Sequence, residues 1–266
     1  MYVDALALAA LMDELRDELM GGRVDDVIQP TPHAIALQCY AHGKNQWLLV
    51  SAHTQFARVH RIPRKPLKLV AEPPAFVMLL RKYLEGARIV ELRQPRWERV
   101  LEICCAHGPG AANVVPTVWL VIEVIGKLSN IILRDEQGVI LGALHQVSAE
   151  VNHYRAIQPH APYRYPPPRT RRLGESELPQ LDPASLTAAD LAQAAGAFLA
   201  RPAHARGKKA PDTGVAAMLA DQILGCSRDL GAEAAMRAFG AADASIHPAT
   251  DWAALARAVH ELAYLY

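Results

Sequence analysis

The chain has 266 residues, of which 51% are apolar and 21% are charged, and its net charge is +1. This length fits one large domain or, more naturally, two of ordinary size, and the apolar share excludes general disorder. No stretch reaches the roughly eighteen uninterrupted apolar residues of a membrane span, and acids interrupt the apolar opening segment as they would not in a secretory signal, so we expect a soluble, cytoplasmic protein without a membrane partner.

The first half of the chain predicts a helix followed by a run of strands. Apolar residues recur at helical spacing from Leu8 to Leu19, and Gly21 and Gly22 end that helix. Further strands are expected near residues 35–39, 47–51, 88–92, 99–105, 117–125, 130–133 and 139–141, with a short helix after Pro73 and Pro74. Helices at both ends of mostly antiparallel strands predict an α+β domain with a mixed or antiparallel sheet.

The second half predicts a connector and a helical domain. Prolines are concentrated at residues 158–182, a composition suited to a semi-rigid, extended linker. Helices are expected at residues 186–199, 215–224 and 227–239 and from 251 onward, with Ser227 as an N-cap and residues 201–211 as a basic loop. We place the domain boundary so that the two domains are residues 1–172 and 173–266.

The four cysteines form neither a disulfide framework nor a metal site. Cys104 and Cys105 are adjacent, and neighbours on a strand point to opposite faces, so they would not chelate one ion together. No Cys-x-x-Cys or His-Glu-x-x-His spacing occurs. We expect reduced thiols, no metal and no cofactor.

Positive charge is unevenly distributed along the chain. Residues 58–99 contain eleven Lys and Arg against four Asp and Glu, and a second cluster comprises Arg164, Arg169, Arg171 and Arg172. Basic surface on a nearly neutral chain is what a binder of phosphate backbones requires. An ordinary solvated surface explains the same charges equally well.

An ordered series of short motifs covers most of the chain. The motifs are Asp4 and residues 18–19, 22–23, 28–30, 48–53, 58–60, 73–76, 79–89, 94–99, 122–133 and 163–168. Together they resemble the N-terminal part of the NFACT family, the bacterial RqcH or fibronectin-binding protein A-like proteins. Residues 218–239 are similar, with lower specificity, to the helix-hairpin-helix region of that family.

The resemblance implies both a fold and a function. The first domain would be similar to the N-terminal domain of formamidopyrimidine-DNA glycosylases, and the second would be a small all-α helix-hairpin-helix domain. Members of the family recognise large ribosomal subunits that carry a stranded peptidyl-tRNA, bring in alanyl-tRNA, and support an untemplated C-terminal alanine tail. The implied partners are therefore tRNA, specifically tRNA-Ala, and the large subunit, and the chain itself would not be an enzyme.

The sequence departs from the family pattern in three respects. Glu98 precedes Arg99 where the family usually has aspartate, and Leu128 stands where the family's Gly-Lys-His-Ser-Asn run has histidine. Family members usually continue into a long coiled coil and a further RNA-binding domain, whereas this sequence has no sustained heptads. We therefore expect a fragment or a short relative.

The resemblance assigns tRNA contacts to Asp4, Glu98, Arg99, Glu123, Gly126 and Lys127. Arg99 is the foremost candidate, because a guanidinium fork matches a phosphate or a guanine edge. Glu98 either accepts a hydrogen bond from a base or orients Arg99, and Asp4 either contacts RNA or caps the first helix. Glu123 is the polar exception in an apolar strand, aimed at the ligand.

Gly126 and Lys127 form either a plain hairpin turn or one that offers donors to a phosphate. Further contacts to an RNA backbone are expected from Arg58, Arg81, Lys82, Arg96, Arg164 and Arg169. Tyr163 and Tyr165 would add stacking around Arg164, although a basic, disordered linker explains that segment as well.

Two other classes of function compete with this one. A DNA glycosylase of the related fold uses an N-terminal proline as its nucleophile, and Tyr2 and Val3 stand there instead, so only a DNA-binding module without catalysis would remain. A fibronectin-binding adhesin is the other class, and we expect it less because the sequence shows neither an export signal nor a disulfide framework.

Overall fold

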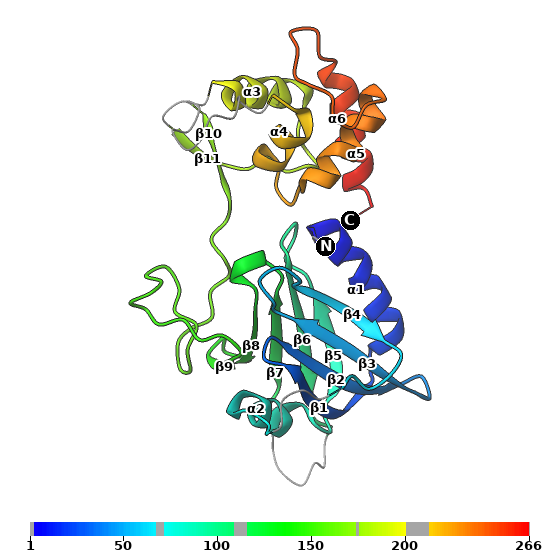
Figure 1. The fold of residues 1–266 in the computed structure, drawn as a ribbon, viewed down its shortest axis with the longest axis vertical. Coiled ribbons are helices and arrows are strands. Elements are labelled where there is room, and N and C mark those ends of the chain that lie inside the picture. Colours follow the sequence, from blue (N-terminus) through cyan, green and yellow to red (C-terminus); the bar gives the residue numbers. More distant parts are fainter. Residues whose placement is uncertain (1–2, 68–71, 109–115, 174–175, 201–212, 266) are drawn as a thin grey trace. The chain divides into compact units, whose positions relative to one another are not determined.

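The computed structural model describes residues 3–67, 72–108, 116–173, 176–200 and 213–265. Within this described part are six α-helices and eleven strands. The contacts of the chain divide it into two compact units, Met1–Pro166 and Pro167–Tyr266 (Figure 1). The sequence analysis set the boundary six residues later, after residue 172. Each unit is described by itself.

The first unit contains a nine-stranded antiparallel sheet in the order β4-β3-β2-β1-β5-β6-β7-β8-β9. Its strands are β1 (Arg23–Thr31), β2 (Ala34–Ala41), β3 (Lys44–Ser51), β4 (Arg58–Ile62), β5 (Arg88–Arg93), β6 (Val100–Ala106), β7 (Val118–Glu123), β8 (Asn130–Asp135) and β9 (Ile140–Ala143). Its helices are α1 (Ala5–Leu19) and α2 (Ala75–Leu84). The predicted α+β class with a large antiparallel sheet is therefore confirmed.

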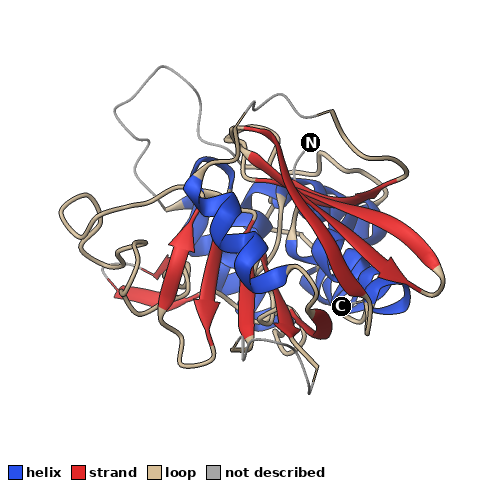
Figure 2. Cartoon of the chain, turned by 90° about the horizontal axis from the view of Figure 1, so that it is seen from below, coloured by secondary structure: helices blue, strands red, loops and turns tan. Residues whose placement is uncertain are grey.

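The sheet consists of two groups of strands joined at β1 and β5, and the two groups are visible in Figure 2. The contact between β1 and β5 is short, since the described register between these two strands consists of the pair Arg23 and Arg88. Both groups contribute to one buried core, in which Leu48 from the first group and Leu120 from the second belong to the same apolar cluster as Leu8 of α1. The shared core explains why loops from opposite groups meet at the same end of the unit.

Local sequence signals explain most of these elements. Asp4 caps α1, since its Oδ1 accepts from the Ala7 amide at 2.8 Å. His42 and Gly43 have φ values of +50° and +75°, which suits the tight two-residue hairpin between β2 and β3. Cys104 and Cys105 lie in different apolar clusters, as expected for neighbours on β6.

Strands β1 and β4 were not predicted from the sequence. The register of β1 against β2 shifts twice, between Val24 and Asp26 and between Ile28 and Thr31. Each shift interrupts the alternation of apolar and polar residues by which a strand is recognised. β4 is a short strand at the edge of the sheet, and edge strands tolerate the charged residues that obscure it.

The second unit packs α3 (Ala188–Leu199), α4 (Val215–Gln222), α5 (Arg228–Phe239) and α6 (Trp252–Ala263) around one apolar cluster. Ser227 caps α5 as predicted, its hydroxyl accepting from the Leu230 amide at 2.9 Å. A β-carbon on Gly231 would lie 2.7 Å from the Ala216 carbonyl oxygen, so α4 and α5 cross at a glycine. The similarities to a helix-hairpin-helix domain and to the glycosylase N-domain remain predictions.

The proline-rich connector differs from its prediction in one part. Thr170–Leu173 (β10) pairs antiparallel with Ser176–Pro179 (β11), so this stretch is a small hairpin rather than an extended linker. Pro179 is the last residue of the second strand, where a missing amide costs little. The predicted basic loop at residues 201–211 lies outside the described residues. No helix in the described part is long and apolar enough to cross a membrane.

Candidate nucleic-acid interface

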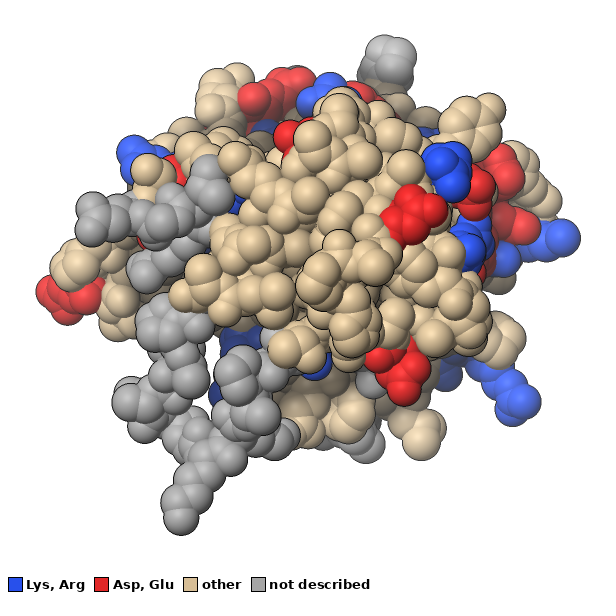
Figure 3. All heavy atoms as spheres, turned by 90° about the horizontal axis from the view of Figure 1, so that it is seen from above, with Lys and Arg blue, Asp and Glu red and all other residues tan. Residues whose placement is uncertain are grey.

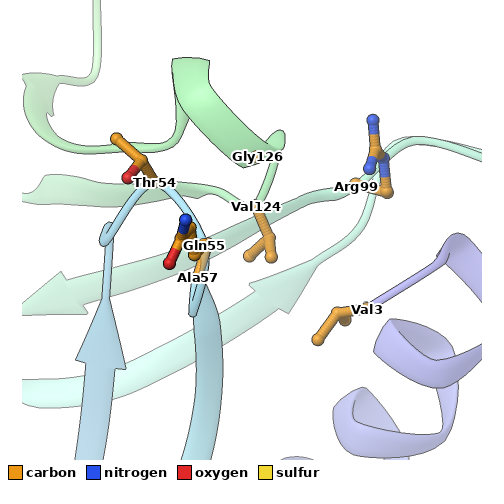
Figure 4. A pocket seen from close by; sticks show the side chains of 7 residues that line it. All are labelled: Val3, Thr54, Gln55, Ala57, Arg99, Val124 and Gly126. Carbon is orange, nitrogen blue, oxygen red and sulfur yellow. The ribbon is translucent and has the colours of Figure 1, made fainter. Parts of the chain in front are cut away.

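A small pocket lies at the end of the first unit where β6 begins, and four segments contribute to it (Figure 4). Its lining residues are Val3, Thr54, Gln55, Ala57, Arg99, Val124 and Gly126. The volume is about 100 Å³. Pockets that enclose whole small molecules measure about 300–1,000 Å³. This one therefore suits a single group of a larger ligand, such as a phosphate.

Arg99 stands at the rim of this pocket, across from Thr54 and Gln55 (Figure 4). Its carbonyl accepts from the Val124 amide at 2.9 Å, which fixes the start of β6 against the end of β7. The preceding segment is tied to α1, because Gln94 Nε2 donates to the carbonyls of Ala5 and Glu98, each at 2.9 Å. The guanidinium therefore projects from a braced backbone, and Glu98 lies in the same half-buried turn.

Gly126 lines the pocket, and it forms a 3-10 turn, η1 (Gly126–Leu128), together with Lys127. Gly126 has a φ of +60°, which favours glycine. The Ser129 hydroxyl accepts from the Ile125 amide at 2.8 Å and closes the turn. Lys127 is exposed and directly follows the lining residue Gly126.

Asp4 borders the pocket next to Val3, and its helix-cap role is confirmed by the hydrogen bond to Ala7. A carboxylate that holds the first turn of α1 also fixes Val3 beside Arg99. Its contact with RNA remains a prediction.

Glu123 does not face the pocket, although its register partner Val100 follows Arg99. Its carboxylate is fully buried and receives both terminal nitrogens of Arg155, at 2.8 and 2.5 Å, and the Tyr163 hydroxyl at 2.9 Å. Burial works against the Arg155 cation, but the hydrogen bond and charge of Glu123 leave the Arg155 pKa raised. Burial, followed by Glu123, raises the pKa of Tyr163. In this structure Glu123 acts as an internal anchor for the segment that carries Arg155.

The other basic residues predicted to contact RNA lie at different sites in the structure. Arg58 is near the pocket, because its Nη1 donates to the Phe56 carbonyl at 3.0 Å in the β3–β4 loop. Arg96 is exposed in the segment before Arg99, with its guanidinium carbon 5.8 Å from the centre of the Trp97 ring. These two cations therefore belong to the same end of the unit as Arg99.

Arg81 and Lys82 are at the other end of β6. His107, which follows β6, contacts the Tyr83 carbonyl through Nε2 at 3.1 Å, whereas Arg99 precedes that strand. Arg81 also donates through Nε to the Val27 carbonyl at 2.9 Å, so part of its role is structural. The structure thus does not bring these two residues to the pocket.

Arg164 is exposed beside the Glu123 anchor, and its carbonyl accepts from Arg155 Nη1 at 2.8 Å. Arg169 is exposed in the second unit. On the face shown in Figure 3, the described acidic and basic side chains are scattered among uncharged ones and form no continuous basic field. The candidate interface rests on Arg99 in the pocket lining and on the exposed Lys127 next to Gly126.

Sequence reasoning overlooked several residues near this pocket. His33, His53 and His145 are neighbours in space but come from three distant segments, and Arg155 finds its buried partner 32 residues away. His53 lies inside a motif that carried the family resemblance, which was the one available signal. The remaining three could be found only through the fold.

The thiols of Cys39 and Cys104 are not reactive nucleophiles. Burial, followed by Asp25, raises the pKa of Cys39 to about 12, and burial raises that of Cys104 to about 11, so both are protonated at neutral pH. Among the residues that the structure describes, no group of three or more His, Cys, Asp or Glu side chains is placed to hold a metal ion.

Comparisons with known proteins agree on one family. Residues 4–262 match the family described as NFACT N-terminal and middle domains. The protein "Rqc2 homolog RqcH" of Bacillus subtilis is 36% identical over 63% of this chain, and its namesake in Streptococcus pneumoniae is 33% identical over 63%. The aligned part is 29% and 30% of those two relatives, so the chain spans about three tenths of their length.

Solved structures show the same fold. The N-terminal part of the fibronectin/fibrinogen-binding protein of Streptococcus suis is 27% identical, with a TM-score of 0.71 over 97% of this chain and 84% of that one. The N-terminal domain of the fibronectin-binding protein PavA of Streptococcus pneumoniae is 28% identical, with a TM-score of 0.67 over 86% and 77%.

Proposed function

The chain belongs to the NFACT family, and from that membership we propose that it binds tRNA as a component of ribosome-associated quality control and catalyses no reaction itself. The match to relatives named as Rqc2 homologues, at 33–36% identity, supports this role. The proposal extends to tRNA-Ala as the preferred tRNA and to the large ribosomal subunit with a stranded peptidyl-tRNA as the site of action. The product it supports is an untemplated alanine tail, made in the cytoplasm by the ribosome's own peptidyl transfer.

The observation that carries the proposal is the pocket between Arg99 and the turn at Gly126 and Lys127. Arg99 lines this cavity, whose size suits one phosphate-like group, and the exposed Lys127 follows the lining residue Gly126 in the chain. No serine, cysteine or histidine side chain lines the pocket as the structure describes it. The arrangement favours recognition of a phosphate backbone or a base edge over chemistry.

Because the chain spans only part of its relatives, the proposed activities are divided between this chain and the assembly in which it works. Three tenths of their length is matched, so we assign tRNA binding to this chain. Subunit binding and alanine tailing are proposed as activities of the assembly in which it works.

A competition experiment tests the tRNA assignment. Labelled tRNA-Ala, bound to the 266-residue chain at near-physiological salt, is challenged with other tRNAs and with abasic-site DNA duplex. We expect tRNA-Ala to remain bound in the presence of both competitors. A Glu98→Ala/Arg99→Ala variant, shown to be folded by circular dichroism, should lose the binding of tRNA-Ala. Displacement by DNA would instead favour a glycosylase-like DNA-binding module, and absence of tRNA binding would contradict the proposal.

A second candidate is fibronectin binding, which the names of the two solved relatives favour. Immobilised fibronectin and labelled tRNA can be compared on the same preparation of the chain. If fibronectin binds while tRNA does not, this second function replaces the first. If both bind, the Glu98→Ala/Arg99→Ala variant separates the two surfaces.

A further inference from the structure

Four rings gather beside the pocket, from three segments of the first unit. The centres of His33 and His53 are 5.4 Å apart with their planes nearly perpendicular, and those of His33 and His145 are also 5.4 Å apart. His53 lies 5.1 Å from Phe56 with an interplanar angle of 30°. Phe56 is 50% exposed, so its ring is accessible to a ligand.

Hydrogen bonds fix the backbone of the segments that carry these rings. His145 is gripped by the buried side chain of Asn130, which accepts from the His145 amide at 3.0 Å and donates to its carbonyl at 2.7 Å. The His33 carbonyl accepts from the Ala52 amide at 2.8 Å, which joins the β1–β2 connection to the β3–β4 loop. His53 Nδ1 accepts from the amide of Gln55 at 3.2 Å. A surface held this firmly loses little entropy when a ligand binds.

The rings and the pocket share their supporting elements. In the β3–β4 loop, Thr54 and Gln55 line the pocket while His53 and Phe56 belong to the ring group. On the other side, Asn130 follows directly after the turn that carries Lys127. The β3–β4 loop therefore carries both pocket residues and rings of this group.

This combination matches the chemistry of an unpaired nucleotide. Single-stranded RNA is bound by stacking its bases on aromatic and histidine rings while cations follow its backbone. Burial, followed by the charge of His33, lowers the pKa of His145, so its ring is neutral at physiological pH and offers an uncharged face. A metal is not indicated, because no described group of three histidines is placed to bind one.

We infer that His33, His53, Phe56 and His145 form a stacking platform for one or two unpaired bases of RNA, with the adjoining phosphates at Arg99 and Lys127. The inference deepens the proposed function and rests on it. It separates two parts of the interface, namely an aromatic part that holds bases and a basic part that holds phosphates.

The test compares Phe56→Ala with Met78→Ala, since Met78 on α2 is 51% exposed and matches Phe56 in exposure. Affinities for tRNA and for a short unstructured RNA oligonucleotide are measured across a range of salt concentrations. We expect Phe56→Ala to weaken both by about 5- to 150-fold, the range for loss of one stacked base, with the salt slope unchanged. Met78→Ala should bind as wild type does. Phe56→Trp should restore binding, and RNA should quench the fluorescence of the new indole.

The outcomes distinguish this inference from the function on which it rests. If wild type binds tRNA and Phe56→Ala binds equally well, the platform is overturned and the proposed function stands. A flattened salt slope in Phe56→Ala also overturns the platform, because the loss would then concern phosphates. If wild type binds neither RNA, both are overturned. Equal melting temperatures of Phe56→Ala and wild type exclude misfolding as the cause of a loss.

Discussion

Replacing Arg155 by alanine should destabilise the first unit strongly, because the change leaves the Glu123 carboxylate buried without its cation. The Glu123 and Arg155 side chains are 0% and 7% exposed, so water cannot take the place of the guanidinium. Breaking a buried ion pair from one side costs roughly 3–5 kcal/mol. The free energy of unfolding should fall by about that amount at pH 7.

Removing both charges should cost less than removing one. In a Glu123→Leu/Arg155→Met variant the core loses its ion pair but holds no uncompensated charge. What remains are the Tyr163 hydroxyl without its acceptor and the Arg164 carbonyl without the Arg155 donor, and each costs about 1–3 kcal/mol where it is buried. The double variant should therefore be more stable than Arg155→Ala.

The free energy of unfolding of each variant is measured by urea denaturation. Intrinsic fluorescence follows the first unit, because Trp47, Trp97 and Trp119 all belong to it. The Arg155→Ala defect should also shrink on acidification. An unpaired buried carboxylate has a folded-state pKa above its unfolded value, so proton uptake favours the folded state at low pH. A loss below about 1 kcal/mol, or a double variant less stable than Arg155→Ala, would refute the reasoning.

Three further changes test separate parts of the fold. Gly231→Ala should destabilise the second unit by about 1–3 kcal/mol, since its β-carbon would lie 2.7 Å from the Ala216 carbonyl; an unchanged melting curve would contradict the close crossing of α4 and α5. Asp4→Ala should cost about 1 kcal/mol while Asp4→Asn keeps the cap, so equal stability of the two in urea would remove the capping role. Burial lowers the pKa of His60 and His145 below 6.5, so the unfolded chain takes up protons first and stability should fall as pH drops below 6.5. Changing both to glutamine should flatten that fall in thermal melts, and an undiminished fall would exclude these histidines as its source.

The sequence predicted elements whose signals are local. Apolar residues recur at helical spacing in α1, where Leu8, Met12, Leu15 and Leu19 are buried. Ser227 stands at the start of α5 as its cap. β1 was missed because its register shifts break the alternation of Val24 to Ile28. Periodicity therefore reveals regular elements and conceals those that contain bulges.

The arrangement of the candidate site depends on long-range contacts that the sequence does not encode locally. Arg81 and Arg99 look alike in a basic stretch, yet β6 separates them because each lies near a different end of that strand. Glu123 appeared to be a polar group aimed at a ligand, and its partner Arg155 becomes visible only when the segment after β9 folds back. The fold places Arg99 and Gly126, two residues to which the resemblance assigned tRNA contacts, in the lining of one pocket.

The most direct test compares two exposed lysines of the same unit. Lys127 lies in the turn beside the pocket, and Lys82 lies near the far end of β6. The affinity of tRNA for wild type, Lys127→Ala and Lys82→Ala is measured against salt concentration. Lys127→Ala should reduce the slope of log affinity against log salt by about one unit, with Lys82→Ala matching wild type. Equal slopes for all three, or a reduction in Lys82→Ala alone, would contradict a tRNA site at the pocket.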